Sequence, residues 1–300
     1  MLHRFFLSLL LCLAASLPLL SQQRPLRTSD AEVLPAGTMR AQVGFDFLQD
    51  VSFPLSGLSG DQTSVGVIGI RLGVGRIVEV QLEGAVRHFL DVKEQVGGFL
   101  KPVLSGPCST TGTPPVLTGR CSTSDVGDFS LFTKIRIFGE TSRRPALAVR
   151  FGFQMPNSDQ ALGIGMNTTN LFADIILQKH FGKLNLLGNL GLAILQSPTA
   201  NFTQNDLLTY GAAFLYPLHG SRSFGINLVG EVAGRHSTRT MTPNLLGTES
   251  RGQGRFGFQI SAGGFQWDVA GIAGLTKQDA RTGFTFGISR DIRLFRYATK

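Results

Sequence analysis

Apolar and polar residues alternate along much of this chain, and the alternation is clearest at residues 76–89, read RIVEVQLEGAVRHF. In an extended chain successive side chains point to opposite faces. One face of this segment is aliphatic: Val78, Val80, Leu82 and Val86. The other face is polar: Glu79, Gln81, Glu83 and Arg87. Period-2 alternation predicts a strand, and about 9–11 residues with one lipid face and one wet face are typical of a transmembrane β-barrel.

The same alternation recurs from residue 39 to residue 290 and predicts about 12 strands, within a range of 10–14. The predicted strands are 39–47, 63–74, 76–89, 128–137, 146–155, 170–180, 184–195, 206–216, 223–235, 254–262, 265–275 and 282–290. Longer polar segments, beginning with 49–62, alternate with short turns. External loops and periplasmic turns of an outer-membrane barrel differ in the same way, which places both termini in the periplasm.

The sequence therefore predicts an all-β, antiparallel, up-and-down transmembrane barrel. The soluble alternative is an antiparallel sandwich or a lipocalin-like closed barrel with the phenylalanines in its core. A helical protein is excluded, because no segment beyond the N-terminus has a clear 3.6-residue stripe.

Composition agrees with a barrel. The chain of 300 residues has 37 Gly, 23 Phe, 3 Cys and only 16% charged residues, against about 25% in soluble domains. The formal net charge is +8. Its basic residues are scattered, and no nucleic-acid motif accompanies them, so we expect no nucleic-acid partner.

The N-terminus predicts a secretory signal peptide at residues 1–21, with a basic start and an apolar core before Ser21. Lipidation at Cys12 and an uncleaved anchor helix are the alternatives. Residues 22–37 contain Pro25 and Pro35 and are expected to form a periplasmic lead-in.

The barrel is expected to span residues 38–292, with an external loop insertion at 91–126 and a C-terminal tail at 293–300. The insertion holds Cys108 and Cys121, which we expect to form a disulfide in an oxidising compartment; two unpaired thiols are the alternative.

Charged residues of both signs occupy the polar faces of the predicted strands. The candidates for lining the lumen are Arg40, Asp46, Arg71, Glu79, Glu83, Arg87, Lys134, Arg136, Arg150, Asp174, Glu231, Arg235, Arg255 and Asp268. Such charges either select what passes through a channel or pair with one another and fill the lumen. Both interpretations stay open at this stage.

No constellation for catalysis is visible. The histidines are scattered, and no G-x-S-x-G or H-x-S element accompanies them. No Cys/His group has the spacing of metal ligands. The sequence predicts no enzyme, no metal site and no cofactor.

Three short motifs resemble a known family. They are G-D-x-x-L-x-x-K-x-R from Gly127 to Arg136, K-H-F-G at 179–182 and G-N-L-G at 188–191. They are similar to segments of the outer-membrane transporters grouped as the meta-pathway of phenol degradation family, and the match covers residues 38 to 290. The resemblance implies a barrel that admits small hydrophobic or aromatic compounds. The chain departs from many barrels in ending with Lys300 rather than an aromatic residue.

The expected function is that of a passive pore or transporter for small solutes in the cell outer membrane. A non-conducting structural or adhesive barrel acting through its external loops is the alternative. The expected partners are outer-membrane lipid and lipopolysaccharide, a small-molecule solute and the barrel-assembly machinery.

Overall fold

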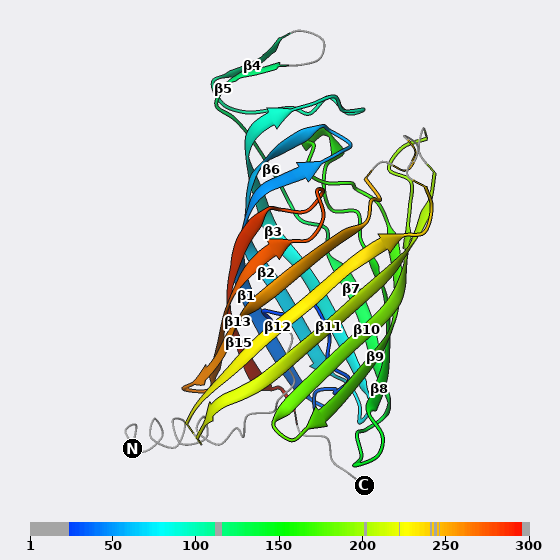
Figure 1. The fold of residues 1–300 in the computed structure, drawn as a ribbon, viewed down its shortest axis with the longest axis vertical. Coiled ribbons are helices and arrows are strands. Elements are labelled where there is room, and N and C mark those ends of the chain that lie inside the picture. Colours follow the sequence, from blue (N-terminus) through cyan, green and yellow to red (C-terminus); the bar gives the residue numbers. More distant parts are fainter. Residues whose placement is uncertain are drawn as a thin grey trace.

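Twelve strands close into one antiparallel barrel in the computed structural model (Figure 1). The structure describes residues 24–295 except 112–115, 201–202, 222, 241, 243–244 and 246, so the predicted signal peptide lies outside the described residues. The strands of the ring are β1 (Thr38–Phe53), β2 (Leu58–Gly73), β3 (Val78–Gln95), β7 (Ser130–Phe138), β8 (Ala146–Gln154), β9 (Asn170–Phe181), β10 (Leu184–Leu195), β11 (Asn205–Gly220), β12 (Phe224–Ser237), β13 (Arg251–Ala262), β14 (Phe265–Gly274) and β15 (Thr282–Arg293). Neighbours in the chain pair with one another, and β1 pairs with β15 to close the ring. The predicted up-and-down barrel is confirmed.

Burial is reversed relative to a soluble protein. Large apolar side chains such as Leu190 and Phe256 are 54% and 57% exposed on the outer face. Arg71 and Lys134 are fully buried inside. A sandwich would bury its phenylalanines in a core, so this alternative is wrong. An apolar outer band around a polar interior suits lipid.

The external end of the barrel is more regular than the sequence predicted. The expected loop 49–62 is wrong, because β1 and β2 continue through most of it and only residues 54–57 connect them. A strand that extends beyond the membrane has water on both faces, so it needs no apolar face and alternation does not mark it.

The loop insertion 91–126 contains strands of its own. The hairpin of β4 (Cys108–Thr111) and β5 (Val116–Gly119) projects from the external end (Figure 1). The predicted disulfide between Cys108 and Cys121 is present. It joins this hairpin to β6 (Cys121–Asp125), which pairs with the outer part of β3.

At the short-turn end, the turn between β7 and β8 is held to β9 by side-chain contacts of Glu140. Glu140 in this turn accepts hydrogen bonds from the backbone N–H and Nδ1 of His180, at 2.9 and 2.7 Å, and lies 3.2 Å from Nζ of Lys179. Burial raises the pKa of the Glu140 carboxyl, but these contacts outweigh burial and hold it below its ordinary value.

A short 3-10 turn, η1 (Gln160–Leu162), lies in the segment between β8 and β9. Within the described residues no helix has the length and apolar character needed to cross a membrane.

Candidate functional site

Residues 24–36, called the plug segment below, lie inside the barrel. The sequence analysis placed them in a periplasmic lead-in, 22–37, and for the described residues this expectation is wrong. The chain enters β1 at Thr38, so the plug segment ends at the short-turn end of the lumen. Its backbone N–H groups and charged side chains bond to side chains on the inner face of the barrel wall, so the segment lies in the lumen and not in the periplasm.

The plug segment follows the wall through a complete circuit. Its partners come from every strand of the ring: Asp46 in β1, Arg71 in β2, Glu79 in β3, Lys134 in β7, Ala148 in β8, Gln178 in β9, Asn189 in β10, Ala213 in β11, Glu231 in β12, Arg255 in β13, Asp268 in β14 and Thr285 in β15. Most of these contacts are polar. Two small apolar clusters, around Leu26 and Ala31, complete the circuit.

Glu231 holds the backbone of the plug segment directly. The N–H of Arg27 donates to both carboxylate oxygens, at 2.8 and 2.9 Å, and the N–H of Thr28 donates to Oε2 at 2.9 Å. Arg255 Nε lies 3.6 Å from the same carboxylate and its Nη1 donates to the carbonyl of Pro25 at 2.8 Å. One inward carboxylate and one inward guanidinium thus hold the backbone of three plug residues, Pro25, Arg27 and Thr28.

A buried cluster of two acids and two bases anchors the other half of the segment. Lys134 Nζ lies 2.8 Å from Asp30 Oδ1 and 3.4 Å from Glu79 Oε1, while Arg71 lies 3.8 Å from each carboxylate. Glu79 also accepts the N–H of Leu34 at 2.8 Å. The charges balance, which is what burial of such groups requires.

Arg24 and Glu32 form further ion pairs with the wall. Arg24 Nη2 lies 2.7 Å from Asp46 Oδ1, and its Nε lies 3.5 Å from Asp268 Oδ1. Arg136 Nη1 lies 2.6 Å from Glu32 Oε2. Eight of the predicted lumen candidates therefore contact the plug segment: Asp46, Arg71, Glu79, Lys134, Arg136, Glu231, Arg255 and Asp268.

Four further candidates lie inside and pair without the plug segment. Arg40 forms a bidentate pair with Asp291, with Nη2 2.7 Å from Oδ2. Arg150 lies 3.0 Å from Asp174 and 3.7 Å from Glu83. The inner face is therefore largely self-neutralised.

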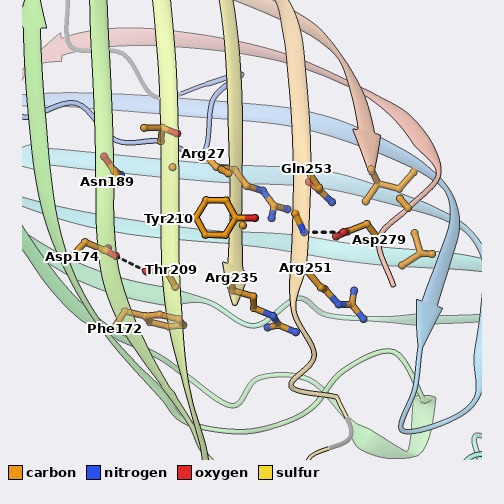
Figure 2. Close-up of a pocket in the computed structure, with 18 of the residues that line it drawn as sticks. Arg27, Phe172, Asp174, Asn189, Thr209, Tyr210, Arg235, Arg251, Gln253 and Asp279 are labelled. Carbon is orange, nitrogen blue, oxygen red and sulfur yellow. Dashed lines mark hydrogen bonds between the residues drawn. The ribbon is translucent and has the colours of Figure 1, made fainter. Parts of the chain in front are cut away.

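Two cavities adjoin Arg27 of the plug segment. One has a volume of about 480 Å³ and is lined by Arg27, Arg150, Arg235 and Arg251 among others (Figure 2). The second, of about 460 Å³, shares Arg27 and Arg150 with the first and extends toward His88. The plug segment thus lies across the lumen and adjoins two cavities.

Arg87 lies on the outer face, so its assignment to the lumen is wrong. Its backbone pairs with Val65, which is 45% exposed, and its guanidinium bonds Ser124. The next residue, His88, bonds the buried Ser64. Gly66, with φ of 63°, sits where the alternation of β2 and β3 reverses. A left-handed residue of this kind marks a break in strand alternation.

Several residues of the site were missed by the sequence analysis. Arg24, Arg27, Asp30 and Glu32 lie in a segment without strand periodicity, so alternation gave no reason to place them inside. Arg251 was assigned to a loop. Its spacing of four from Arg255 on the same strand face would have placed it inward.

The structure brings together two Ser–His pairs that the sequence did not reveal. In one of them, Ser250 Oγ lies 3.3 Å from Nδ1 of His236. The other pair is closer. Ser64 Oγ lies 2.7 Å from Nδ1 of His88, and Nε2 of His88 has no hydrogen-bond partner among the described residues. Ser64 is buried, and a serine nucleophile requires a base oriented by a third group. In the described part of the chain, no group of three or more His, Cys, Asp or Glu is placed to hold a metal ion.

Comparison with known proteins shows the fold. No family model and no curated protein matches the chain. Among solved structures, the COG4313 outer membrane channel from Pseudomonas putida F1 is 13% identical, with 88% of this chain and 98% of that chain covered and a TM-score of 0.55. This protein is an outer-membrane β-barrel. It has the fold of an outer-membrane channel, and its apolar outer face belongs in the lipid of the cell outer membrane.

Two other solved barrels are similar at lower scores. LpxR from Salmonella typhimurium is 8% identical, with 84% of this chain and 99% of that chain covered and a TM-score of 0.45. The NanC porin is 7% identical, with 86% and 100% covered and a TM-score of 0.42.

Proposed function

We propose that this protein is a gated pore for small solutes and that the plug segment is its closure. The observation that carries the proposal is how the segment is attached. Its contacts with the wall run through inward side chains. Among the described residues, the one backbone–backbone hydrogen bond between 24–36 and a strand of the ring is the turn bond from the N–H of Thr38 to the carbonyl of Pro35, where the chain enters β1. The segment can therefore leave without opening the barrel's hydrogen-bonded wall.

The chemistry of the contacts suits a reversible closure. Buried ion pairs contribute little net stability, because desolvation offsets much of their attraction. When the plug segment moves out, water replaces the protein partners of Glu231, Lys134 and Arg255 in a wet lumen. A permanent filling would be better served by apolar packing, which contributes about 25 cal/mol per Å² buried.

A planar bilayer distinguishes the pore from the alternative. We expect the refolded chain to conduct rarely and the variant lacking residues 24–36 to conduct steadily. Heat-dependent gel migration of both proteins verifies that each barrel has folded. A folded deletion variant without conductance would overturn the pore. It would favour a structural or adhesive barrel that acts through the external β4–β5 hairpin, whose disulfide to β6 supports that second candidate.

The finer expectations belong to the same proposal. They are kinship with the meta-pathway of phenol degradation transporters, a solute that is hydrophobic or aromatic, a transport rather than an enzymatic role, and contact with lipopolysaccharide and the barrel-assembly machinery. The motifs from Gly127 to Arg136 and at 188–191 support the kinship.

A further inference from the structure

Three guanidinium groups converge on the 480 Å³ cavity from different parts of the chain. Arg27 comes from the plug segment, Arg235 from β12 and Arg251 from β13; Figure 2 shows Arg235 and Arg251 in one part of the cavity and Arg27 apart from them, near Tyr210. Arg235 donates to the carbonyls of Gly247 and Glu249, and Arg251 donates to the carbonyl of Ser52. Within the described residues, none of the three forms an ion pair with a carboxylate.

The carboxylates that line the cavity are already engaged. Asp279 accepts the N–H of Gly252 at 2.8 Å and the hydroxyl of Thr276 at 2.6 Å. Asp174 is paired with Arg150 at 3.0 Å and accepts the hydroxyl of Thr209. Four arginines and two aspartates line the cavity, and Glu249 nearby offsets part of the charge of Arg235 and Arg251; the balance around the cavity is positive, which attracts an anion.

The remaining wall of the cavity is apolar. Phe132 and Phe172 lie with ring centroids 5.8 Å apart, and Arg150 covers the Phe132 ring at 4.4 Å. Leu48, Val51 and Phe53 of β1 add aliphatic and aromatic surface. A concave site of about 300–1,000 Å³ with an apolar wall and a few convergent charges is typical of small-ligand recognition.

We propose that this cavity binds small organic anions that carry a carboxylate on a ring-sized apolar body. The carboxylate lies against Arg235 and Arg251, because a guanidinium donates two parallel hydrogen bonds to a carboxylate, and Arg27 adds positive charge to the same cavity. The apolar body lies against Phe132 and Phe172. The inference builds on the proposed pore, since it names the class of solute that the pore admits.

The proposed site also includes a residue of the plug segment. Arg27 is the exposed residue of the plug segment, and its backbone N–H is held by Glu231. The site has all of its residues only while the plug segment is docked, so an anion bound there contacts the plug segment before it crosses the barrel.

Calorimetric titration of the refolded full chain in detergent tests the site without requiring transport. The probes are benzoate, benzamide as its uncharged analogue, and acetate as an anion without a ring. We expect benzoate to bind at least tenfold more tightly than either of the others. The double variant Arg235→Gln/Arg251→Gln should lose at least tenfold in benzoate affinity.

The matched control is Arg87→Gln/Arg290→Gln, which removes the same charge from the outer face, where Arg290 covers the Phe265 ring. We expect it to bind benzoate like the unmodified chain. Absence of benzoate binding, equal binding of benzamide, or full affinity in a folded Arg235→Gln/Arg251→Gln chain would each overturn the inference. The deletion of 24–36 tests the pore separately by conductance, so the two proposals fail independently.

Discussion

The substitution Glu231→Gln should release the plug segment while leaving the barrel wall intact. The change keeps the size of the side chain but removes its charge and replaces one acceptor oxygen with an NH₂ group. In the structure both oxygens accept backbone N–H groups, those of Arg27 and Thr28, at 2.8–2.9 Å. The glutamine amide keeps one oxygen that can accept from these N–H groups, while its NH₂ group cannot accept. It also leaves Arg255 beside a neutral group.

The magnitude follows from the two N–H groups involved. A hydrogen bond to a charged acceptor contributes about 1.5–3 kcal/mol, against about 0.5–1.5 kcal/mol for a neutral one. Losing the charge at two such bonds therefore weakens docking by about 2–3 kcal/mol. Since 1.4 kcal/mol is tenfold, the ratio of released to docked plug should rise by about 30- to 140-fold.

The assay is the open fraction of single channels in a planar bilayer. The control is Glu83→Gln, the same substitution on the inner face at a carboxylate that lies 3.7 Å from Arg150, its ion-pair partner on β8. If Glu231→Gln opens no more often than Glu83→Gln, while both barrels are folded, the reasoning about plug docking is refuted.

Three further outcomes are expected. Lys134→Gln should weaken plug docking by about 3–5 kcal/mol, because it removes one partner of a buried ion pair; adding Asp30→Asn should restore part of the closed state in the same bilayer assay. The pKa of Glu140 is held below its ordinary value. The ionised carboxylate therefore stabilises the folded state at any pH above the ordinary pKa, and this stabilisation is lost as the pH falls through the lowered pKa. Glu140→Gln should therefore cost up to about 1 kcal/mol in denaturant unfolding at pH 7 and nothing near pH 2. Cys108→Ser/Cys121→Ser should remove about 3 kcal/mol from the external hairpin, which exposes it to trypsin, and leave the heat-dependent gel shift unchanged.

The sequence predicted the strands of the wall well, because each strand has one face toward lipid and one toward a polar interior, and this imposes the alternation of apolar and polar residues. Glu79 and Lys134 were placed inward from their strand faces alone, and the structure pairs them at 3.4 Å. Arg87 fails the same rule because Gly66 takes a φ of 63° where β2 and β3 reverse their faces. A single glycine conformation is not visible in a pattern of apolar residues.

The position of the plug segment could not be predicted from the sequence for a different physical reason. Residues 24–36 have neither a strand period nor a helical stripe, and their place is fixed by backbone N–H groups bonding to Glu231, Gln178 and Glu79. Backbone donors are the same at every residue except proline. Which carboxylates and amides meet them therefore depends on the closed ring and not on the segment itself.

The most direct test of the closure is a disulfide that locks the plug segment to the wall. A Cβ at Gly211 would lie 3.4 Å from Cβ of Thr28, close to the separation of about 3.5–4.5 Å that a disulfide requires. The variant Thr28→Cys/Gly211→Cys is made with Glu231→Gln, for frequent openings, and with serine at both native cysteines. The account predicts that oxidation abolishes channel openings and that reduction restores them. Unchanged conductance in protein shown to be fully cross-linked would contradict the claim that residues 24–36 close the pore.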